Sequence, residues 1–122
     1  MNTPALLYCL AALGPLLNQI ALLFGAPLGH LTMGGRWQGQ LPAHIRPLTA
    51  VQAALLLAMM SVVLDYAGMV NIGWPDWAIW PTLAITLLST VANLGTPSRM
   101  ERLLWGPATL LMSASLLWLV FL

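Results

Sequence analysis

The chain has very little charge and no lysine. Its four basic residues are all Arg, and charged residues make up only 6% of its 122 residues, whereas a soluble domain has about a quarter. So few charges cannot solvate a globular surface, which excludes a water-soluble fold. A net charge of +1 also excludes nucleic acid as an expected partner. The lone cysteine, Cys9, excludes an internal disulfide and a cysteine metal cluster.

Hydrophobic residues instead make up 60% of the chain. They form four stretches of about 20 residues, the length that crosses a hydrocarbon core of roughly 30 Å. Pro47 and the capping-box pair Ser98 and Glu101 mark helix starts, and Gly95 marks a helix end. We therefore predict an all-α integral membrane protein with a single domain, residues 1–122. Its four transmembrane helices form an antiparallel bundle and cover about residues 4–24, 47–66, 76–94 and 99–122.

The arginines predict the orientation of this bundle. They fall in the first and third connections, which lie on the same side of a four-helix bundle: Arg36, Arg46, Arg99 and Arg102. Because positive charge stays on the cytoplasmic side, we expect both termini outside. The other side carries Asp65 and Asp76 at the interface, so no carboxylate is expected at mid-membrane. The first stretch has neither a charged start nor a small-residue cleavage site, so we interpret it as a membrane helix rather than a signal peptide.

The segment from Ala26 to Arg46 is longer than a connection between two membrane helices needs to be. We predict a long structured cytoplasmic loop here, with an anion site that combines arginine forks and glycine amides. The residues of this site are Gly34, Gly35, Arg36, Arg46, His30 and His44. The simpler interpretation is a surface loop whose arginines contact lipid phosphates and fix the topology. The two histidines have no third ligand nearby, so no metal is expected, and no cofactor motif occurs.

Polar side chains recur at one depth, roughly 7–10 Å inside the cytoplasmic helix ends at 1.5 Å per residue. This polar layer consists of Asn18, Gln52, Thr90 (or Ser89), Asn93 and Thr109. Amides that face lipid are costly, so we expect the layer to point into the bundle. Interhelical hydrogen bonds, worth about 0.6 kcal/mol each, are the interpretation we favour. The alternative is a polar pocket that opens towards the arginine-bearing segment.

One motif resembles a known group of proteins. It reads Gly34-Gly35-Arg36, Gly39-Gln40-Leu41-Pro42 and Arg46, and it is similar to a pattern in small, functionally uncharacterised four-helix proteins of the bacterial inner membrane. The resemblance covers about one connection and one helix start. It implies a bacterial inner-membrane location and no particular activity.

Three functions fit these observations. We favour a non-enzymatic protein that acts by association, as an accessory subunit or a self-assembling bundle, with the bilayer and a second copy or another membrane protein as partners. The small residues Ala50, Ala54 and Ala58 would let another helix approach closely. The alternatives are an oligomeric channel or transporter and a membrane enzyme with a cytoplasmic-interface site. Missing embedded acids argue against proton-coupled transport, and missing nucleophile–base pairs argue against an enzyme.

Overall fold

The computed structural model describes residues 2–122 and has four long helices in that range. They are α1 (Thr3–Leu23), α2 (Arg46–Tyr66), α3 (Ile79–Leu94) and α4 (Arg99–Phe121). Counting the short 3₁₀ helix η3 (Asp76–Ala78) with α3, all four are long and apolar enough to cross a membrane. The all-helical prediction with four such helices is confirmed. Met1, the first residue of the predicted domain, lies outside the described residues.

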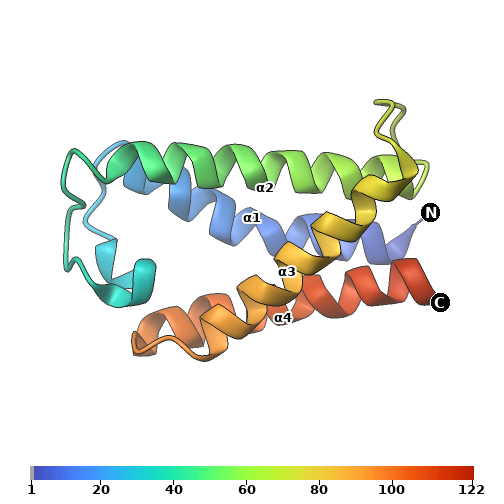
Figure 1. Ribbon diagram of the computed structural model, residues 1–122. Helices are drawn as coiled ribbons and strands as arrows, with labels where there is room; N and C mark the ends of the chain where they lie inside the picture. Colours follow the sequence, from blue (N-terminus) through green and yellow to red (C-terminus); the bar gives the residue numbers. More distant parts are fainter. Residues whose placement is uncertain (1) are drawn as a thin grey trace.

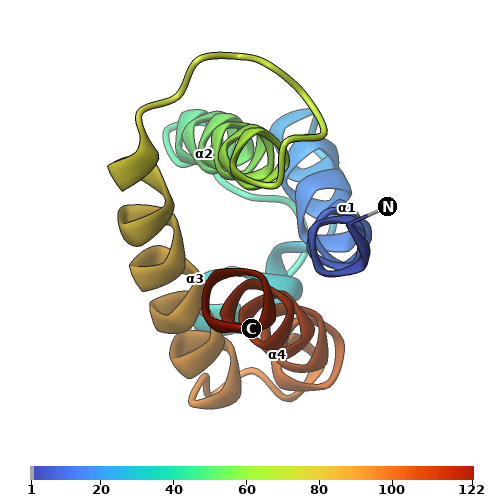
Figure 2. The same ribbon diagram turned by 90° about the vertical axis from the view of Figure 1, so that its right-hand side faces the viewer.

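The helices lie side by side around a common axis. Figure 1 shows both termini and the α2–α3 connection at one end, here called the terminal end. The other end carries the α1–α2 and α3–α4 connections and all four arginines, and we call it the arginine end (residues 24–46 and 95–102). Viewed along the bundle, the order around the ring is α1, α2, α3, α4 (Figure 2). α1 packs on both α2 and α4, and α3 packs mainly on α4.

The connection between α1 and α2 differs from the prediction of one long loop, which is wrong. Two 3₁₀ helices, η1 (Gly29–Leu31) and η2 (Met33–Gly35), divide it into short linkers. Local backbone hydrogen bonds build these turns. The Leu31 N–H donates to the Leu28 carbonyl, and the Gly35 N–H donates to the Thr32 carbonyl, both at 2.9 Å. Gly34 and Gly35 have φ angles of 69° and 73°, which glycine adopts without a steric penalty. The segment is therefore folded on itself.

The helix starts follow from local capping. The Asn2 side chain accepts a hydrogen bond from the Ala5 N–H at the start of α1. The Ser98 hydroxyl accepts one from the Glu101 N–H at the start of α4, as the capping-box spacing predicts. α2 begins with Pro47 in its first turn, where its missing N–H costs nothing.

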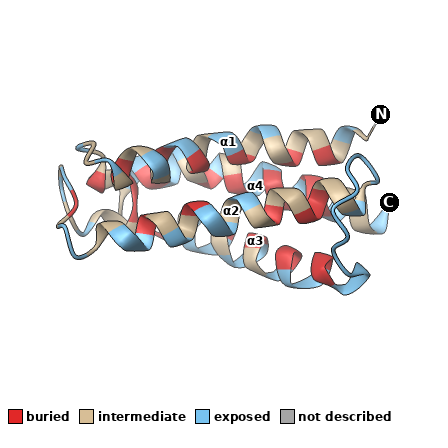
Figure 3. Ribbon diagram, turned by 90° about the horizontal axis from the view of Figure 1, so that it is seen from above, coloured by how far each residue is buried: buried red, intermediate tan, exposed pale blue. Residues whose placement is uncertain are grey.

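The hydrophobic core lies towards the terminal end. It joins buried side chains from α1, α2, α3 and α4, among them Tyr8, Val63, Leu83, Met112 and Leu116. The Tyr8 side chain is fully buried, and its hydroxyl lies 2.8 Å from the Thr86 hydroxyl on α3. In Figure 3 the buried residues face the inside of the bundle, and the exposed residues face outward. Many of the exposed residues are large and apolar, including Leu10, Leu17, Leu88 and Val91.

Tyr8 therefore allows a test of what holds α1 against α3. Tyr8→Phe should cost only about 0.6 kcal/mol, since it removes one interhelical hydrogen bond and keeps the ring. Tyr8→Ala should cost about 3–5 kcal/mol, because it leaves a cavity in the core. Unfolding by denaturing detergent in mixed micelles measures both. Equal losses for the two variants would contradict this account of the core.

Candidate functional site

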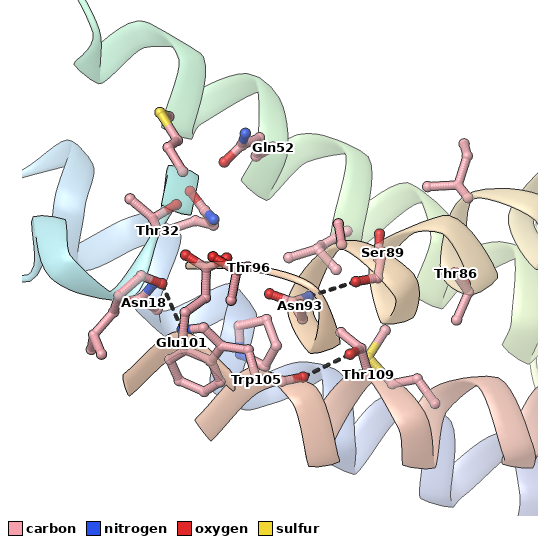
Figure 4. A pocket seen from close by; sticks show the side chains of 18 of the residues that line it. Asn18, Thr32, Gln52, Thr86, Ser89, Asn93, Thr96, Glu101, Trp105 and Thr109 are labelled. Carbon is pink, nitrogen blue, oxygen red and sulfur yellow. Dashed lines mark hydrogen bonds between the residues drawn. The ribbon is translucent and has the colours of Figure 1, made fainter. Parts of the chain in front are cut away.

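A cavity of about 570 Å³ lies at the arginine end of the bundle. That volume falls in the range of roughly 300–1,000 Å³ typical of small-molecule sites. Its walls come from α1, α2, α3, α4 and the η1–η2 segment, and most of the lining is apolar. The polar lining residues are Asn18, Gln19, Thr32, Gln52, Thr86, Ser89, Asn93, Thr96, Glu101 and Thr109, most of which are labelled in Figure 4. The lining contains no Arg or His.

Three side-chain amides at the cavity have unmatched hydrogen-bonding capacity. Asn18 is only 6% exposed, and its buried Oδ1 has no partner. The buried Oε1 atoms of Gln19 and Gln52 have none either. A buried polar group without a partner costs about 1–3 kcal/mol. Native proteins rarely leave such groups unpaired, unless water or a ligand completes the bonds. Of the four such atoms in residues 2–122, three thus belong to residues that line this cavity, and the fourth, the Ser115 hydroxyl, lies outside the lining.

Glu101 brings a carboxylate to the same cavity. It lies in the first turn of α4 and is only 7% exposed. Its Oε2 accepts a hydrogen bond of 3.2 Å from the Gly34 N–H in η2. The positive end of the α4 dipole also favours a negative group at this position. Sequence reasoning treated Glu101 only as half of a capping box and missed its place in the cavity.

A signal for Glu101 was nevertheless present. It is the only glutamate in the chain and the only acidic residue in either arginine-bearing connection or the helix starts beside them. A capping Glu normally turns back to its own N-cap N–H. In this fold η2 offers the Gly34 N–H instead. The side chain therefore leaves the surface and becomes part of the cavity wall.

The start of α4 holds the η1–η2 segment in place through three contacts. Besides the Gly34–Glu101 bond, the Ser98 hydroxyl donates to the His30 carbonyl at 2.6 Å. The Trp105 indole N–H donates to the Leu31 carbonyl at 2.9 Å (Figure 4). A Cβ added at Gly14 would lie 3.0 Å from the Trp105 ring, so the ring would have to shift by a few tenths of an ångström to accept it. The segment is thus a fixed wall of the cavity.

The exposed part of the cavity lining lies on α2, on α3 and just after α3. The exposed lining residues are Leu55 on α2, Ala92 on α3 and Pro97 just after α3. Leu55 is 43% exposed although it lines the cavity. α3 packs mainly on α4 and has few contacts with α2. The mouth therefore lies on the side of the bundle, between two helices.

Four of the five polar-layer residues predicted from the sequence line this one cavity: Asn18, Gln52, Asn93 and Thr109. The Ser89 alternative lines it as well, and its carbonyl accepts from the Asn93 side chain at 2.8 Å. Thr90 lies outside the lining. Its hydroxyl is 2.6 Å from the Ser113 hydroxyl and 2.8 Å from the Thr109 carbonyl, so it links α3 to α4. The layer therefore contains both a cavity lining and an interhelical link.

The two glycines of the predicted anion site bind side chains of the protein itself, and its two histidines differ in exposure. The Gly34 N–H already binds a carboxylate, that of Glu101. The Gly35 carbonyl accepts from the Gln38 side chain at 2.7 Å. The His30 side chain is half-buried and the His44 side chain is exposed.

The two arginines of that site also lie apart from the cavity lining. Arg36 is exposed, and its guanidinium lies 4.9 Å from the centre of the Trp37 ring. Arg46 is half-buried, and its Nε donates to the Leu41 carbonyl at 3.2 Å. The external anion site stays a prediction, and in this fold the Gly34 N–H binds the carboxylate of Glu101.

Comparison of the chain with models of known protein families, with curated proteins and with solved structures finds no match. The cavity and its residues are therefore the basis of the function proposed below.

The Gly34–Glu101 bond can be tested directly. Glu101→Ala should speed hydrogen exchange at the Gly34 amide by about tenfold or more, because a hydrogen bond to a charged group contributes about 1.5–3 kcal/mol. Arg99→Ala is the matched control, since Arg99 is exposed at the start of the same helix. Mass spectrometry of deuterium uptake over residues 29–36 measures both variants. Unchanged uptake in Glu101→Ala would show that the bond does not hold the segment.

Proposed function

We propose that the protein is a multi-pass membrane protein that binds a small organic molecule in the cavity at the arginine end, as a carrier or a binding subunit. The observation that carries this proposal is the set of buried, unpartnered amides, above all Asn18 and Gln52, that line a cavity of suitable size. A mainly apolar lining with a few converging polar groups is typical of a small-molecule site. It favours a molecule with an apolar body and a polar head.

Membrane insertion is part of the proposal. The four helices have the length and composition for it, and their outward faces carry large apolar side chains. Helices satisfy their own backbone hydrogen bonds, so a bundle of this kind suits a bilayer. Successive helices run antiparallel in the bundle we propose. The resemblance of the motif around Gly34 favours the inner membrane of a bacterium.

The cavity favours binding or transport over catalysis. Neither His30 nor His44 lines it, and Cys9 does not either. An acyl or phosphoryl transfer site needs a nucleophile within reach of a base. The only titratable side chain in the lining is that of Glu101. These features support a site that holds a molecule without changing it.

Association, as an accessory subunit or a self-assembling bundle, is the second candidate. It is favoured by the small-residue stripe on α2, where Ala54 is exposed and Ala50 and Ala58 are half-buried. Another helix can approach such a stripe closely. Association and ligand binding use different faces of α2, so one does not exclude the other.

The orientation gives one testable prediction. All four arginines lie at the arginine end, so that end should face the cytoplasm and both termini the opposite side. Fusions of a reporter active only in the periplasm to either terminus should be active. Moving the charges, with Arg36→Gln and Arg46→Gln plus two arginines after Asn71, is the control and should weaken that activity. A cytoplasmic C-terminus in the parent would contradict the orientation.

Ligand binding gives a second prediction. In lipid nanodiscs, the protein should bind the neutral probe phenethyl alcohol in excess of empty nanodiscs. Ser89→Phe should lower that affinity by about tenfold or more, because a ring added to the lining fills the cavity. Leu88→Phe is the matched control, since Leu88 is the preceding residue, is 68% exposed and lies outside the lining. Equilibrium dialysis measures all three proteins.

The comparison between the two variants decides the result. A loss in Ser89→Phe together with parent-like binding in Leu88→Phe supports the cavity as the binding site. Equal binding in all three proteins, or no binding above that of empty nanodiscs, would overturn the proposed function.

A further inference from the structure

We propose that the molecule bound in the cavity is a lipophilic amine in its ammonium form, and that the Glu101 carboxylate is its counter-ion. This inference rests on the proposed function, since it names the chemical class of the ligand for the same cavity.

The buried carboxylate of Glu101 lies in a cavity whose lining contains no basic residue. The nearest arginine in the sequence, Arg102, is exposed, and its Nη1 donates to the Thr96 carbonyl at 2.6 Å. Arg46 donates to the Leu41 carbonyl, and Arg36 lies over Trp37. Arg99 is exposed. None of the four arginines lines the cavity, although Arg102 contacts the lining residue Thr96, and Glu101 is the one ionisable group in the lining.

A buried charge is costly unless it is paired and hydrogen-bonded. The Gly34 N–H and the start of α4 compensate part of the Glu101 charge. They are partial charges, whereas an ammonium group supplies a full opposite charge and donates hydrogen bonds. A cationic ligand would therefore supply the part of the compensation of the Glu101 charge that the protein lacks.

The neighbouring groups suit the rest of an ammonium ion. Such a group has donors only. The unpartnered oxygens of Asn18 and Gln52 are acceptors on residues that line the same cavity, and Asn18 is more than nine-tenths buried. The Trp105 ring also lines the cavity, and an aromatic face attracts a cation. Of these three groups, Asn18 lies on α1 and Gln52 on α2, so two of them come from other helices than Glu101.

The cavity is larger than a bare metal ion requires. Its volume of about 570 Å³ fits an organic molecule. Among residues 2–122, no three His, Cys, Asp or Glu side chains come together as a metal cluster. Flexible apolar side chains, those of Met33, Met59 and Met112, line the remaining space and can adapt to a hydrocarbon body. The mouth between α2 and α3 suits a molecule that arrives from the bilayer.

Three probes of similar size and different charge test the inference. They are phenethylamine, phenethyl alcohol and phenylacetate, each measured by equilibrium dialysis against the protein in uncharged nanodiscs. We expect the protonated amine to bind about tenfold or more tightly than the alcohol, and phenylacetate to bind most weakly. Glu101→Gln keeps an oxygen for the Gly34 N–H and removes the charge. It should reduce the amine-to-alcohol ratio to about one.

Two controls accompany this variant. Arg99→Gln changes the charge at the start of the same helix on an exposed side chain, and it should keep the parent ratio. Hydrogen exchange at the Gly34 amide shows whether Glu101→Gln has kept the η1–η2 segment in place. If that variant fails to fold, the ranking of the three probes on the parent protein decides the question.

The outcomes separate the two proposals. If the parent binds all three probes equally, or if Glu101→Gln folds and keeps the parent ratio, the amine assignment is overturned. In either case, loss of the alcohol in Ser89→Phe would still support the cavity as a binding site. If Ser89→Phe affects no probe, the proposed function fails, and the amine assignment fails with it.

Discussion

The hydrogen bond from the Gly34 N–H to the Glu101 carboxylate joins two parts of the chain that are 67 residues apart. It draws η2 onto the start of α4, where Ser98 and Trp105 add further bonds to η1. The folded η1–η2 segment then becomes a wall, and the space between the helices becomes a cavity. Without this bond the Glu101 carboxylate would lose its backbone partner in η2, and only the Ser98 and Trp105 bonds would join the segment to α4.

Buried polar side chains are paired to different degrees in the two halves of the bundle. Thr82, Thr86 and Thr90 on α3 each donate to the carbonyl four residues earlier, so short hydroxyls satisfy themselves inside the apolar core. The amide oxygens of Asn18 and Gln52, two residues that line the cavity, have no such partner. The terminal half thus pairs most of its buried polar groups, with the Ser115 hydroxyl as an exception, whereas the arginine half leaves three amide oxygens unpaired.

Much of this fold follows from the sequence, and the limits are local. The four helices and the inward-facing layer follow from apolar length and from the cost of exposing amides to lipid, which depend on each residue's type and spacing alone. The turns in the α1–α2 connection do not follow, because they depend on backbone bonds such as that between Gly35 and Thr32. The role of Glu101 does not follow either. A capping glutamate has a local partner in every isolated helix, and only tertiary packing offers the Gly34 N–H in its place.

The lateral mouth between α2 and α3 affects the apparent affinity of ligands. In a bilayer this mouth faces hydrocarbon, so the concentration of a molecule at the entrance is set by its oil–water distribution. Each added methylene favours the oil phase by about 0.8 kcal/mol, or about fourfold. Members of a homologous series would thus show rising apparent potency with chain length when doses are counted in water. If doses are expressed per lipid instead, the potency would hardly change along the series until the chain became too long for the cavity.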